Sequence, residues 1–422
     1  MKKVVIVGLG YVGLPLAVAI AEAGEYEVLG VDVVLSKIKK INSKKSPFFD
    51  PELEKRLKVV DLLATDDFDK AKNADYYIIC VPTPVTNTYE PDLQPLKSAS
   101  LSVAKVLKAG SKVIIESTIN PGVCEEEVIP IIEEASGLKV GRDFELAHCP
   151  ERINPGDSRW SVYNIPRNIG ASTKEGAEEI AQFYRTFIKA PINVVSSLKV
   201  AESTKIIENT FRDINIAYVN ELAKSFDKMG IDLVETIQAA SNKPFAFMPH
   251  YPGCGVGGHC IPVDPYYLIK RAKKSGFDHQ FLKIAREVNN SMPLYAVSRL
   301  QEGLNHLSLP VKGTKVLLYG LSYKADVGDL RESPALEIIK LLKILEADLS
   351  LFDPYLPEKS NVENMEVGLK SAKAVLVATS HKEIKSVDFS KYPNVKVVID
   401  GRNCLDKDKI TKLGIYYKGI GR

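Results

Sequence analysis

The chain has 422 residues, enough for two or three domains that each bury a core of their own. Hydrophobic residues make up 45% of the sequence and charged residues 26%, proportions typical of a soluble globular enzyme. The formal net charge of +3 is nearly balanced, so nothing in the composition indicates binding to nucleic acid or to an anionic membrane.

The N-terminal stretch superficially resembles a secretion signal, because two lysines precede the long uncharged segment 4–21. Three glycines and Pro15 interrupt that segment at the spacing of a nucleotide-binding turn, so we interpret it as part of a folded domain. We find no other stretch apolar enough to span a bilayer. The six cysteines lack the spacing of zinc sites, which favours a reducing, cytoplasmic location.

The first half of the chain alternates short β-branched segments with amphipathic ones, the pattern of βαβ units on a parallel sheet. Strands are predicted at residues 3–7, 28–32, 76–80, 112–116, 144–148 and 192–195. Between residues 199 and 230, apolar side chains recur every three or four positions, which predicts one long helix that ends at Gly230. Because apolar residues also occur off its main stripe, we expect this helix to connect domains and to form a dimer interface.

A second α/β unit is predicted to begin at Lys315, after a linker at residues 310–313. Its strands are expected at 316–319, 349–353, 374–378 and 395–400, with a helix near 333–345. The predicted fold class is therefore α/β, with two Rossmann-like doubly wound parallel-sheet domains joined by a long central helix. The expected domain boundaries are 1–198, 199–310 and 311–422.

The sequence GLGYVG at 8–13 follows the first predicted strand and opens a helix, as a dinucleotide-binding turn does. Gly8 permits the tight turn, Gly10 lets the backbone approach a pyrophosphate, and Gly13 allows close packing of the helix on the strand. Asp32 ends the next strand, 19 residues after Gly13, where a carboxylate binds ribose hydroxyls. That carboxylate would repel a 2′-phosphate, so we predict NAD rather than NADP as cofactor.

Two later turns add candidate cofactor contacts. The sequences CVPTP at 80–84 and ESTINP at 116–121 stand at the carboxyl ends of predicted strands, where ligands bind in such sheets. Thr83 and Thr118 are therefore candidate contacts to the cofactor. The alternative is that their hydroxyls only stabilise turns.

The sequence GCGVGGHCIPVD at 253–264 brings four glycines close to Cys260. Glycine-dense loops seldom form cores, so we interpret Cys260 as a presented thiol rather than a small buried apolar residue. His259 is a general base, a ligand or a structural residue, and Asp264 is placed to organise water beside the thiol. A nicotinamide site together with a presented thiol indicates oxidation of an alcohol past the aldehyde to an acid, through a thioester.

The long helix carries a polar group that suits this chemistry. Lys205 and Asn209 are four residues apart and share a face, and Arg212 lies on the adjacent strip. Such a group can stabilise a developing oxyanion and a nearby phosphate. The alternative is a solvated polar face, which Glu202 and Glu208 favour.

With these residues in place, the chain resembles the UDP-sugar 6-dehydrogenases, a family that includes UDP-glucose and UDP-N-acetylhexosamine dehydrogenases. The resemblance covers nearly the whole length. It rests on VGLGYVGLP at 7–15, VPTP at 81–84, EST at 116–118, PERINPG at 150–156, residues 205–212, VGGHCIPVD at 256–264, GLSYK at 320–324, DLRESP at 329–334 and DGRN at 400–403.

The resemblance implies a four-electron oxidation of C6 of a UDP-sugar to a uronate. In the family, a cysteine at the position of Cys260 traps the aldehyde as a thiohemiacetal that becomes a thioester. Lys205 and Asn209 match the positions that stabilise oxyanion charge. The positions that arrange water and proton transfer correspond to Asp264, Glu151 and Thr118.

The family also implies contacts to both ligands, and no metal. Cofactor-binding positions correspond to Gly8, Gly10, Tyr11, Val12, Gly13, Asp32, Lys37, Thr83, Thr118 and Arg331. Substrate-binding positions correspond to Arg152, Ile153, Lys205, Asn209, Arg212, Gly257, Tyr323, Lys324 and Arg402. Lys37 replaces a frequent arginine and keeps a cation near the adenosine. The third domain is therefore expected to bind UDP, the first NAD, and the long helix a second copy of the chain.

Departures from the UDP-glucose enzymes favour the N-acetylhexosamine branch. The cysteine loop contains Gly-Gly-His-Cys instead of Gly-Gly-Ser-Cys, and Pro155 occupies the position of a second glutamate. Mannosamine enzymes generally carry His-Pro-Arg before the glycine loop, but residues 242–247 lack that arginine. Residues 153–157 and 265–267 resemble the glucosamine and galactosamine enzymes. We therefore expect UDP-GlcNAc or UDP-GalNAc as substrate, and a product used in polysaccharide synthesis.

Four alternatives stay open. Two are the UDP-N-acetylmannosamine and UDP-glucose dehydrogenases. A third is a non-catalytic UDP-sugar-binding regulator, against which the intact set Cys260, Lys205, Asn209 and Asp264 argues. The fourth is a two-electron 3-hydroxyacid-type dehydrogenase, which would need neither the thiol loop nor a second α/β domain.

Overall fold

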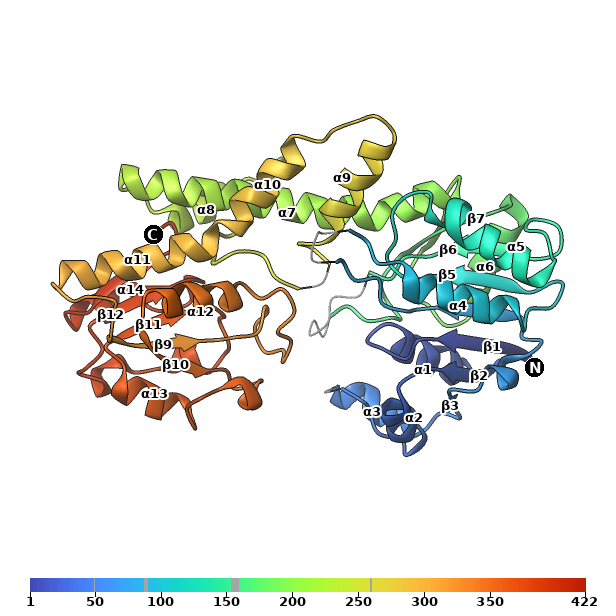
Figure 1. Cartoon of the computed structure of the whole chain (residues 1–422), viewed down its shortest axis with the longest axis horizontal. Helices are drawn as coiled ribbons and strands as arrows, with labels where there is room; N and C mark the ends of the chain where they lie inside the picture. Colours follow the sequence, from blue (N-terminus) through green and yellow to red (C-terminus); the bar gives the residue numbers. More distant parts are fainter. Residues whose placement is uncertain (49, 87–89, 153–158, 259) are drawn as a thin grey trace. The chain divides into compact units, whose positions relative to one another are not determined.

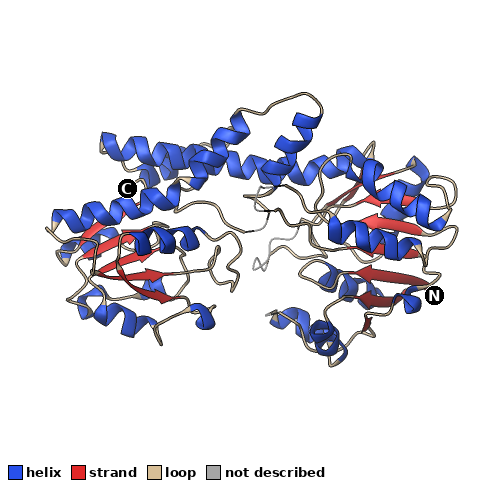
Figure 2. Cartoon of the chain, in the orientation of Figure 1, coloured by secondary structure: helices blue, strands red, loops and turns tan. Residues whose placement is uncertain are grey.

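The computed structural model describes residues 1–48, 50–86, 90–152, 159–258 and 260–422. The described residues form two compact units, and the colours of Figure 1 follow the sequence from the N-terminus to the C-terminus. The N-terminal unit comprises residues 1–208 and 266–275, and the C-terminal unit comprises residues 209–265 and 276–422. Each unit contains a sheet with helices packed against it (Figure 2), so the predicted α/β class is confirmed.

The described part of the N-terminal unit contains an eight-stranded sheet in the order β3-β2-β1-β4-β5-β6-β7-β8. The strands are β1 (Lys2–Val7), β2 (Tyr26–Val31), β3 (Leu63–Thr65), β4 (Tyr76–Ile79), β5 (Lys112–Ile115), β6 (Glu145–His148), β7 (Arg167–Ala171) and β8 (Ile192–Val194). Neighbours pair in parallel, except that β6 and β7 are antiparallel. The strand order reverses between β1 and β4, the place where open α/β sheets bind ligands.

Both faces of this sheet are covered, which explains why its strands are almost continuously apolar. Val4 and Ile6 of β1 belong to one core cluster, whereas Val5 and Val7 belong to another on the opposite face. The helices of this unit are α1 (Gly13–Ala23), α2 (Leu35–Asn42), α3 (Pro51–Leu57), α4 (Gln94–Ala104), α5 (Ile129–Ser136), α6 (Lys174–Arg185) and most of α9 (Asp264–Lys274), with short turns η1 (Phe68–Ala71) and η2 (Cys124–Val128).

The predicted long helix is α7 (Leu198–Met229), with 32 residues. Gly230 ends it in the left-handed region at φ 71°, a conformation that glycine adopts without strain. The Asp232 carboxylate accepts a hydrogen bond from the backbone N–H of Glu235 and thereby caps α8 (Leu233–Ala240). Two further helices, α10 (Phe281–Asn290) and α11 (Met292–His306), lead into the second sheet.

The C-terminal unit contains, within its described residues, a five-stranded parallel sheet in the order β10-β9-β11-β12-β13. Its strands are β9 (Lys315–Tyr319), β10 (Asp348–Phe352), β11 (Ala374–Val377), β12 (Val397–Asp400) and β13 (Tyr416–Gly419). Around them lie α12 (Pro334–Ile344), α13 (Met365–Ser371) and α14 (Lys407–Lys412), with short turns η3 (Pro357–Lys359), η4 (Ile384–Ser386) and η5 (Phe389–Lys391). Here the strand order reverses between β9 and β11.

The structure confirms all ten predicted strands and both predicted helices, and it adds three strands that the sequence did not indicate. β3 has only three residues, β7 begins with the charged Arg167, and β13 ends in Lys418 and Gly419. None of them has the alternating or continuously apolar pattern on which strand prediction depends.

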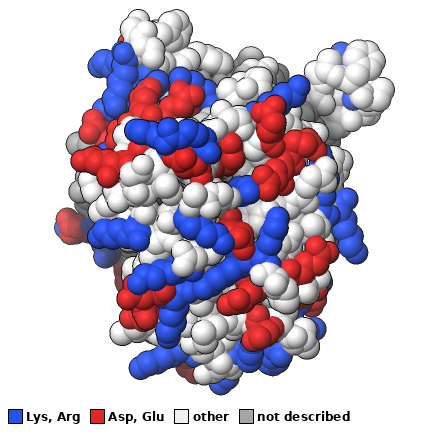
Figure 3. Space-filling view, turned by 90° about the vertical axis from the view of Figure 1, so that its right-hand side faces the viewer, with Lys and Arg blue, Asp and Glu red and all other residues white. Residues whose placement is uncertain are grey.

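The surface carries charges of both signs. Figure 3 shows lysine and arginine interspersed with aspartate and glutamate on the face that it presents. Within the described residues, no helix is both long and apolar enough to cross a membrane.

Candidate active site

The first glycine turn has the geometry that dinucleotide binding requires. Gly8 has φ 95°, and a Cβ atom there would lie 2.7 Å from the carbonyl oxygen of Cys80. A Cβ at Gly13 would collide with the carbonyl oxygen of Gly8, so the start of α1 packs directly on the turn. By contrast, no described atom lies within 4 Å of a Cβ built at Gly10, which leaves room for a ligand beside the backbone.

The two residues between Gly10 and Gly13 complete this turn. Tyr11 is exposed over part of its surface, and its ring lies 4.2 Å from the ring of Phe48. The carbonyl oxygen of Val12 accepts the N–H of Leu16 in the first turn of α1. The start of this helix is therefore fixed next to the turn, as pyrophosphate binding at a helix N-terminus requires.

Asp32 is held at the end of β2 by three donors. Its carboxylate accepts hydrogen bonds from the N–H of Leu9 at 2.8 Å and the N–H of Val34 at 2.9 Å. The Lys37 ammonium lies 3.2 Å from the same carboxylate. The negative charge predicted for ribose recognition is thus placed beside the glycine turn, and the residues present fit NAD.

The two threonine turns are joined to each other. The hydroxyl of Thr83 donates to the carbonyl oxygen of Thr118 at 2.6 Å, which links the turns after β4 and β5. The hydroxyl of Tyr267, on α9, donates to the carbonyl oxygen of Thr83. Thr83 therefore has the structural role considered above, and both threonines are only partly buried at the ligand-binding edge of the sheet.

A buried charge cluster lies beside these turns, and sequence reasoning missed its centre. Arg167 of β7 is fully buried and forms ion pairs with Glu151 and, at 3.4 Å, with Glu116. The hydroxyl of Tyr184 donates to Glu116 at 2.5 Å. Burial raises the pKa of Glu116, although the charge of Arg167 opposes that rise. One cation therefore serves two carboxylates, of which Glu151 is a candidate catalytic residue.

The polar residues of α7 divide between structural and candidate catalytic positions. Glu202 is buried and accepts the backbone N–H groups of Gly122 and Cys124, so it is not part of a solvated face. Glu208 pairs with Arg152 at 2.6 Å. Burial of His148 lowers its pKa to about 3, and the positive charge of Lys205 contributes to this lowering. The charge of Lys205 therefore acts on residues at the carboxyl ends of β5 and β6, namely Glu116 and His148.

Arg152 is anchored on the protein as well as available to a ligand. Besides its pair with Glu208, its guanidinium donates to the carbonyl oxygen of Pro166 at 3.0 Å. Arg212 is exposed on α7. Ile153 and His259, which the sequence also singled out, lie outside the described residues.

Cys260 lies four residues before the start of α9 and is partly buried. Its carbonyl oxygen accepts the N–H groups of Val263 at 3.1 Å and Asp264 at 2.8 Å, which fixes the turn between the thiol and the helix. The buried carboxylate of Asp264 accepts a hydrogen bond from the side-chain amide of Asn209 at 2.6 Å. The structure thus brings together Cys260, Asp264 and Asn209, three of the six predicted catalytic residues.

The glycine loop packs against the segment between β9 and α12 of its own unit. A Cβ atom at Gly257 would lie 2.7 Å from the Cβ of Tyr323, and one at Gly258 would lie 2.8 Å from its ring. The N–H of Gly258 donates to the carbonyl oxygen of Arg331 at 3.0 Å. These glycines are required by close approach, since any side chain would push the loop away from Tyr323.

The other end of this loop is held by residues that the sequence analysis did not identify. The N–H of Gly253 donates at 3.0 Å to the side chain of Asn220, which is fully buried on α7. Asn220 in turn donates to Asn289 of α10. Each stands on a helical face that also carries a buried charge, Asp213 on α7 and Arg286 on α10, so neither face has the apolar pattern that would mark it as buried.

The predicted nucleotide-binding residues follow the strands of the second sheet. Tyr323 and Lys324 follow β9, and Arg402 follows β12 and donates to the carbonyl oxygen of Ala378 at 3.0 Å. A bidentate pair with Asp329 raises the pKa of Arg331, and the charge of Cys260 contributes to that rise.

The chain matches one family of enzymes over three consecutive segments. Residues 2–188 match the NAD binding domain of the UDP-glucose/GDP-mannose dehydrogenase family, 199–291 its central domain, and 317–407 its UDP binding domain.

Full-length relatives agree with this match. The chain is 38% identical to a UDP-N-acetyl-D-mannosamine dehydrogenase of Pyrococcus horikoshii, over 100% of this chain and 99% of the relative. It is also 38% identical to a UDP-N-acetyl-D-glucosamine 6-dehydrogenase of Pseudomonas aeruginosa, over 96% and 98% of the two chains. The solved structure of a UDP-D-ManNAc dehydrogenase from P. horikoshii superimposes with a TM-score of 0.94 at 37% identity, covering 100% of this chain and 99% of that one. The chain therefore belongs to the UDP-glucose/GDP-mannose dehydrogenase family and has its NAD-binding and UDP-binding domains.

Proposed function

We propose that the protein is an NAD-dependent UDP-N-acetylhexosamine 6-dehydrogenase that converts the C6 alcohol of its substrate to a carboxylate. Family membership supports a dehydrogenase acting on a nucleotide sugar, and the two relatives named for N-acetylhexosamines support the sugar class. The observation that carries the proposal is the seating of the Cys260 loop against Tyr323, beside the paired Asn209 and Asp264.

The overall reaction adds water to the alcohol and removes two hydrides and three protons, leaving a carboxylate. NAD, when bound, supplies the acceptor for each hydride. The thiolate of Cys260 attacks the aldehyde carbon, forming a C–S bond while the carbonyl oxygen takes up a proton. Loss of the second hydride and of that proton gives a thioester, and attack of water on the thioester breaks the C–S bond and returns the thiolate.

The side chains around the thiol have separate roles in this proposal. Lys205 and Asn209 stabilise the negative oxygen that forms at C6. Asp264 holds Asn209 in place and, with Glu151, orients the hydrolytic water and accepts its proton. Thr118 completes the water network at the end of β5. Each role concerns charge that develops during the reaction, where fixed donors contribute most.

We assign the contacts to the two ligands mainly to residues that follow strands of the two sheets. NAD is held by residues 8–13, Asp32, Lys37 and Thr83, and Arg331 is a further proposed contact to it. The UDP-sugar is held by Tyr323, Lys324 and Arg402, and by Arg152, Ile153, Arg212, Gly257 and the helix residues named above. Arginine and lysine suit a diphosphate because they donate charge-assisted hydrogen bonds. We assign cofactor binding to residues 1–198, the thiol loop and dimer contacts to 199–310, and UDP binding to 311–422.

We favour the gluco or galacto configuration of the sugar, because residues 242–247 lack the arginine typical of mannosamine enzymes. UDP-N-acetylmannosamine is the second candidate, supported by the likeness to the P. horikoshii protein over the whole chain. A panel of UDP-GlcNAc, UDP-GalNAc, UDP-ManNAc and UDP-glucose, with kcat/KM and NADH counted for each, separates these readings. The proposal fails if none of the three N-acetylated sugars yields two NADH per molecule consumed.

We further propose a cytoplasmic homodimer formed through α7. Four apolar side chains on one stripe of this helix are exposed, at 42% for Val200, 60% for Ile207, 46% for Phe211 and 58% for Tyr218. Spacings of seven and eleven residues place them on the same face. A second copy of the same stripe would cover them. In analytical ultracentrifugation we expect the wild type to sediment as a dimer and the Ile207→Glu variant as a monomer.

A further inference from the structure

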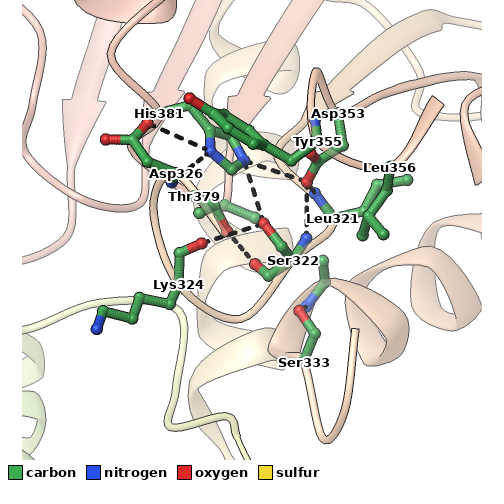
Figure 4. A network of polar contacts seen from close by, with 12 residues as sticks. Leu321, Ser322, Lys324, Asp326, Ser333, Asp353, Tyr355, Leu356, Thr379 and His381 are labelled. Atoms are coloured by element: carbon green, nitrogen blue, oxygen red, sulfur yellow. Dashed lines mark hydrogen bonds and ion pairs between the residues drawn. The ribbon is translucent and has the colours of Figure 1, made fainter. Parts of the chain in front are cut away.

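A network of buried polar side chains lies where the strand order of the second sheet reverses. Ser322 follows β9, Asp353 follows β10, and Thr379 and His381 follow β11 (Figure 4). The side chains of His381 and Asp353 are fully buried. The nucleotide-binding residues proposed above belong to the same edge of this sheet, but none of the reaction steps uses this network.

Asp353 is the charged centre of the network. Its carboxylate accepts the backbone N–H groups of Leu321 at 2.7 Å, Ser322 at 2.8 Å and Tyr355 at 2.8 Å, and Nε2 of His381 at 3.1 Å. Burial alone would raise its pKa, but the hydrogen bonds from His381 and from these N–H groups lower the pKa of Asp353 to about 2. The carboxylate is therefore ionised and needs all of its donors.

His381 joins three segments through its two ring nitrogens. The backbone N–H of Asp326 donates to Nδ1 at 2.9 Å, so Nδ1 carries no proton and the proton is on Nε2. Nε2 lies 3.1 Å from the carboxylate of Asp353 and 3.1 Å from the hydroxyl of Ser322. The ring of Tyr355 stacks on the imidazole at 5.0 Å. Only a side chain with a donor and an acceptor at this separation can make both connections.

The connections hold the segment 320–329 at two internal positions. At Ser322, the hydroxyl of Thr379 donates to the backbone carbonyl oxygen at 2.5 Å, and the Ser322 hydroxyl donates to the carbonyl oxygen of Lys324 at 3.2 Å. At Asp326, the backbone N–H donates to His381. Tyr323 and Lys324 lie between these anchors, and Figure 4 shows the Lys324 side chain directed away from the network.

The same segment supports the thiol loop. Tyr323 lies so close to the loop that a Cβ atom built at Gly257 or Gly258 would be 2.7 or 2.8 Å from it. Two residues beyond the segment, the carbonyl oxygen of Arg331 accepts the N–H of Gly258. A shift of segment 320–329 would therefore move the surface on which the Cys260 loop is seated. The residues proposed to bind the substrate and the position of the Cys260 loop therefore both depend on segment 320–329.

We propose that His381 is a positioning residue that holds segment 320–329 in the conformation in which Tyr323 and Lys324 receive the UDP diphosphate and the Cys260 loop stays seated. This inference rests on the proposed function, since it assigns UDP to that segment. His381 acts through the segment and not through contact with the substrate. The NAD-binding residues 8–13 and Asp32 belong to the other unit, and Arg331, the NAD contact proposed in this unit, lies outside segment 320–329 and is not a partner in the hydrogen bonds of His381.

The test compares full-length His381→Ala and His381→Gln with the wild type and with His306→Ala, which removes an exposed histidine from the same unit. Calorimetry measures UDP binding, and steady-state kinetics measure KM for the UDP-sugar and for NAD. For His381→Ala we expect UDP affinity to fall about tenfold, the effect of losing one hydrogen bond to a charged group, with KM for the sugar rising alike. KM for NAD stays within about twofold, and glutamine, which offers a donor and an acceptor, restores part of the loss.

Two milder variants keep the test decisive if His381→Ala does not fold. Thr379→Val and Ser322→Ala remove single hydrogen bonds from the same segment and should lower UDP affinity about threefold. Unchanged UDP affinity in a folded His381→Ala or in both milder variants overturns the inference, as does an equal rise of both KM values. If the wild type binds UDP but oxidises no UDP-sugar, the proposed function fails while calorimetry still decides the role of His381. A wild type that does not bind UDP refutes both.

Discussion

Replacing the buried Arg167 by leucine should destabilise the protein more than any exposed arginine does. The change removes the cation that forms ion pairs with Glu116 and Glu151, both of which are buried. Breaking a buried ion pair by removing one partner costs about 3–5 kcal/mol, because the remaining charge is left in the interior. We expect a loss of about 4 kcal/mol in the free energy of unfolding, measured by urea denaturation followed by circular dichroism.

Two controls separate charge from packing. Arg185→Leu breaks a surface pair with Glu178 and should cost less than about 1 kcal/mol. Adding Glu116→Gln to Arg167→Leu removes one of the two stranded carboxylates and should restore part of the lost stability. Burial already raises the pKa of Glu116 above its unfolded value, so its contribution to stability is present at low pH and is lost as pH rises through the folded pKa. The Arg167→Leu deficit should therefore shrink toward pH 4, and a deficit below about 1 kcal/mol at pH 7 would refute the reasoning.

Three further predictions concern the N-terminal unit. Lys205→Ala should lower kcat by about 10²–10³ with little change in melting temperature, as loss of an oxyanion donor does. Asp32→Asn should raise KM for NAD about tenfold and leave kcat at saturating NAD near the wild-type value. The pKa of His148 is lowered to about 3 in the fold, so its stabilising effect is complete above the unfolded pKa near 6.5 and is lost as pH falls toward 3. His148→Gln should remove about 2–3 kcal/mol of that loss at pH 4.5, seen as a flatter dependence of unfolding free energy on pH.

The parts of the fold that depend on local sequence were predictable. The glycine turn and Asp32 are recognisable because a strand, a turn and a carboxylate occur at fixed spacing. α7 is recognisable because its apolar residues keep a helical period over 32 residues. β7 was missed because Arg167 stands where an apolar residue would be expected, and its two carboxylate partners, Glu116 and Glu151, follow the other strands β5 and β6.

The parts of the site that depend on packing were not predictable. Glu202 and Glu208 suggested a solvated helix face, but Glu202 is buried under two backbone N–H groups and Glu208 pairs with Arg152. The glycines before Cys260 indicate that another group closely approaches the backbone there, but the sequence does not identify that group. The structure identifies it as Tyr323, from a segment more than sixty residues further along the chain.

The proposed mechanism requires a covalent bond between Cys260 and the oxidised carbon, and one comparison tests for that bond most directly. Wild type and Cys260→Ala are supplied with the best UDP-sugar of the panel, and NADH and uronate are both counted. We predict two NADH per uronate for the wild type, and no uronate from a folded Cys260→Ala that still binds UDP and NAD. Release of uronate with two NADH at the wild-type rate by Cys260→Ala would contradict the account.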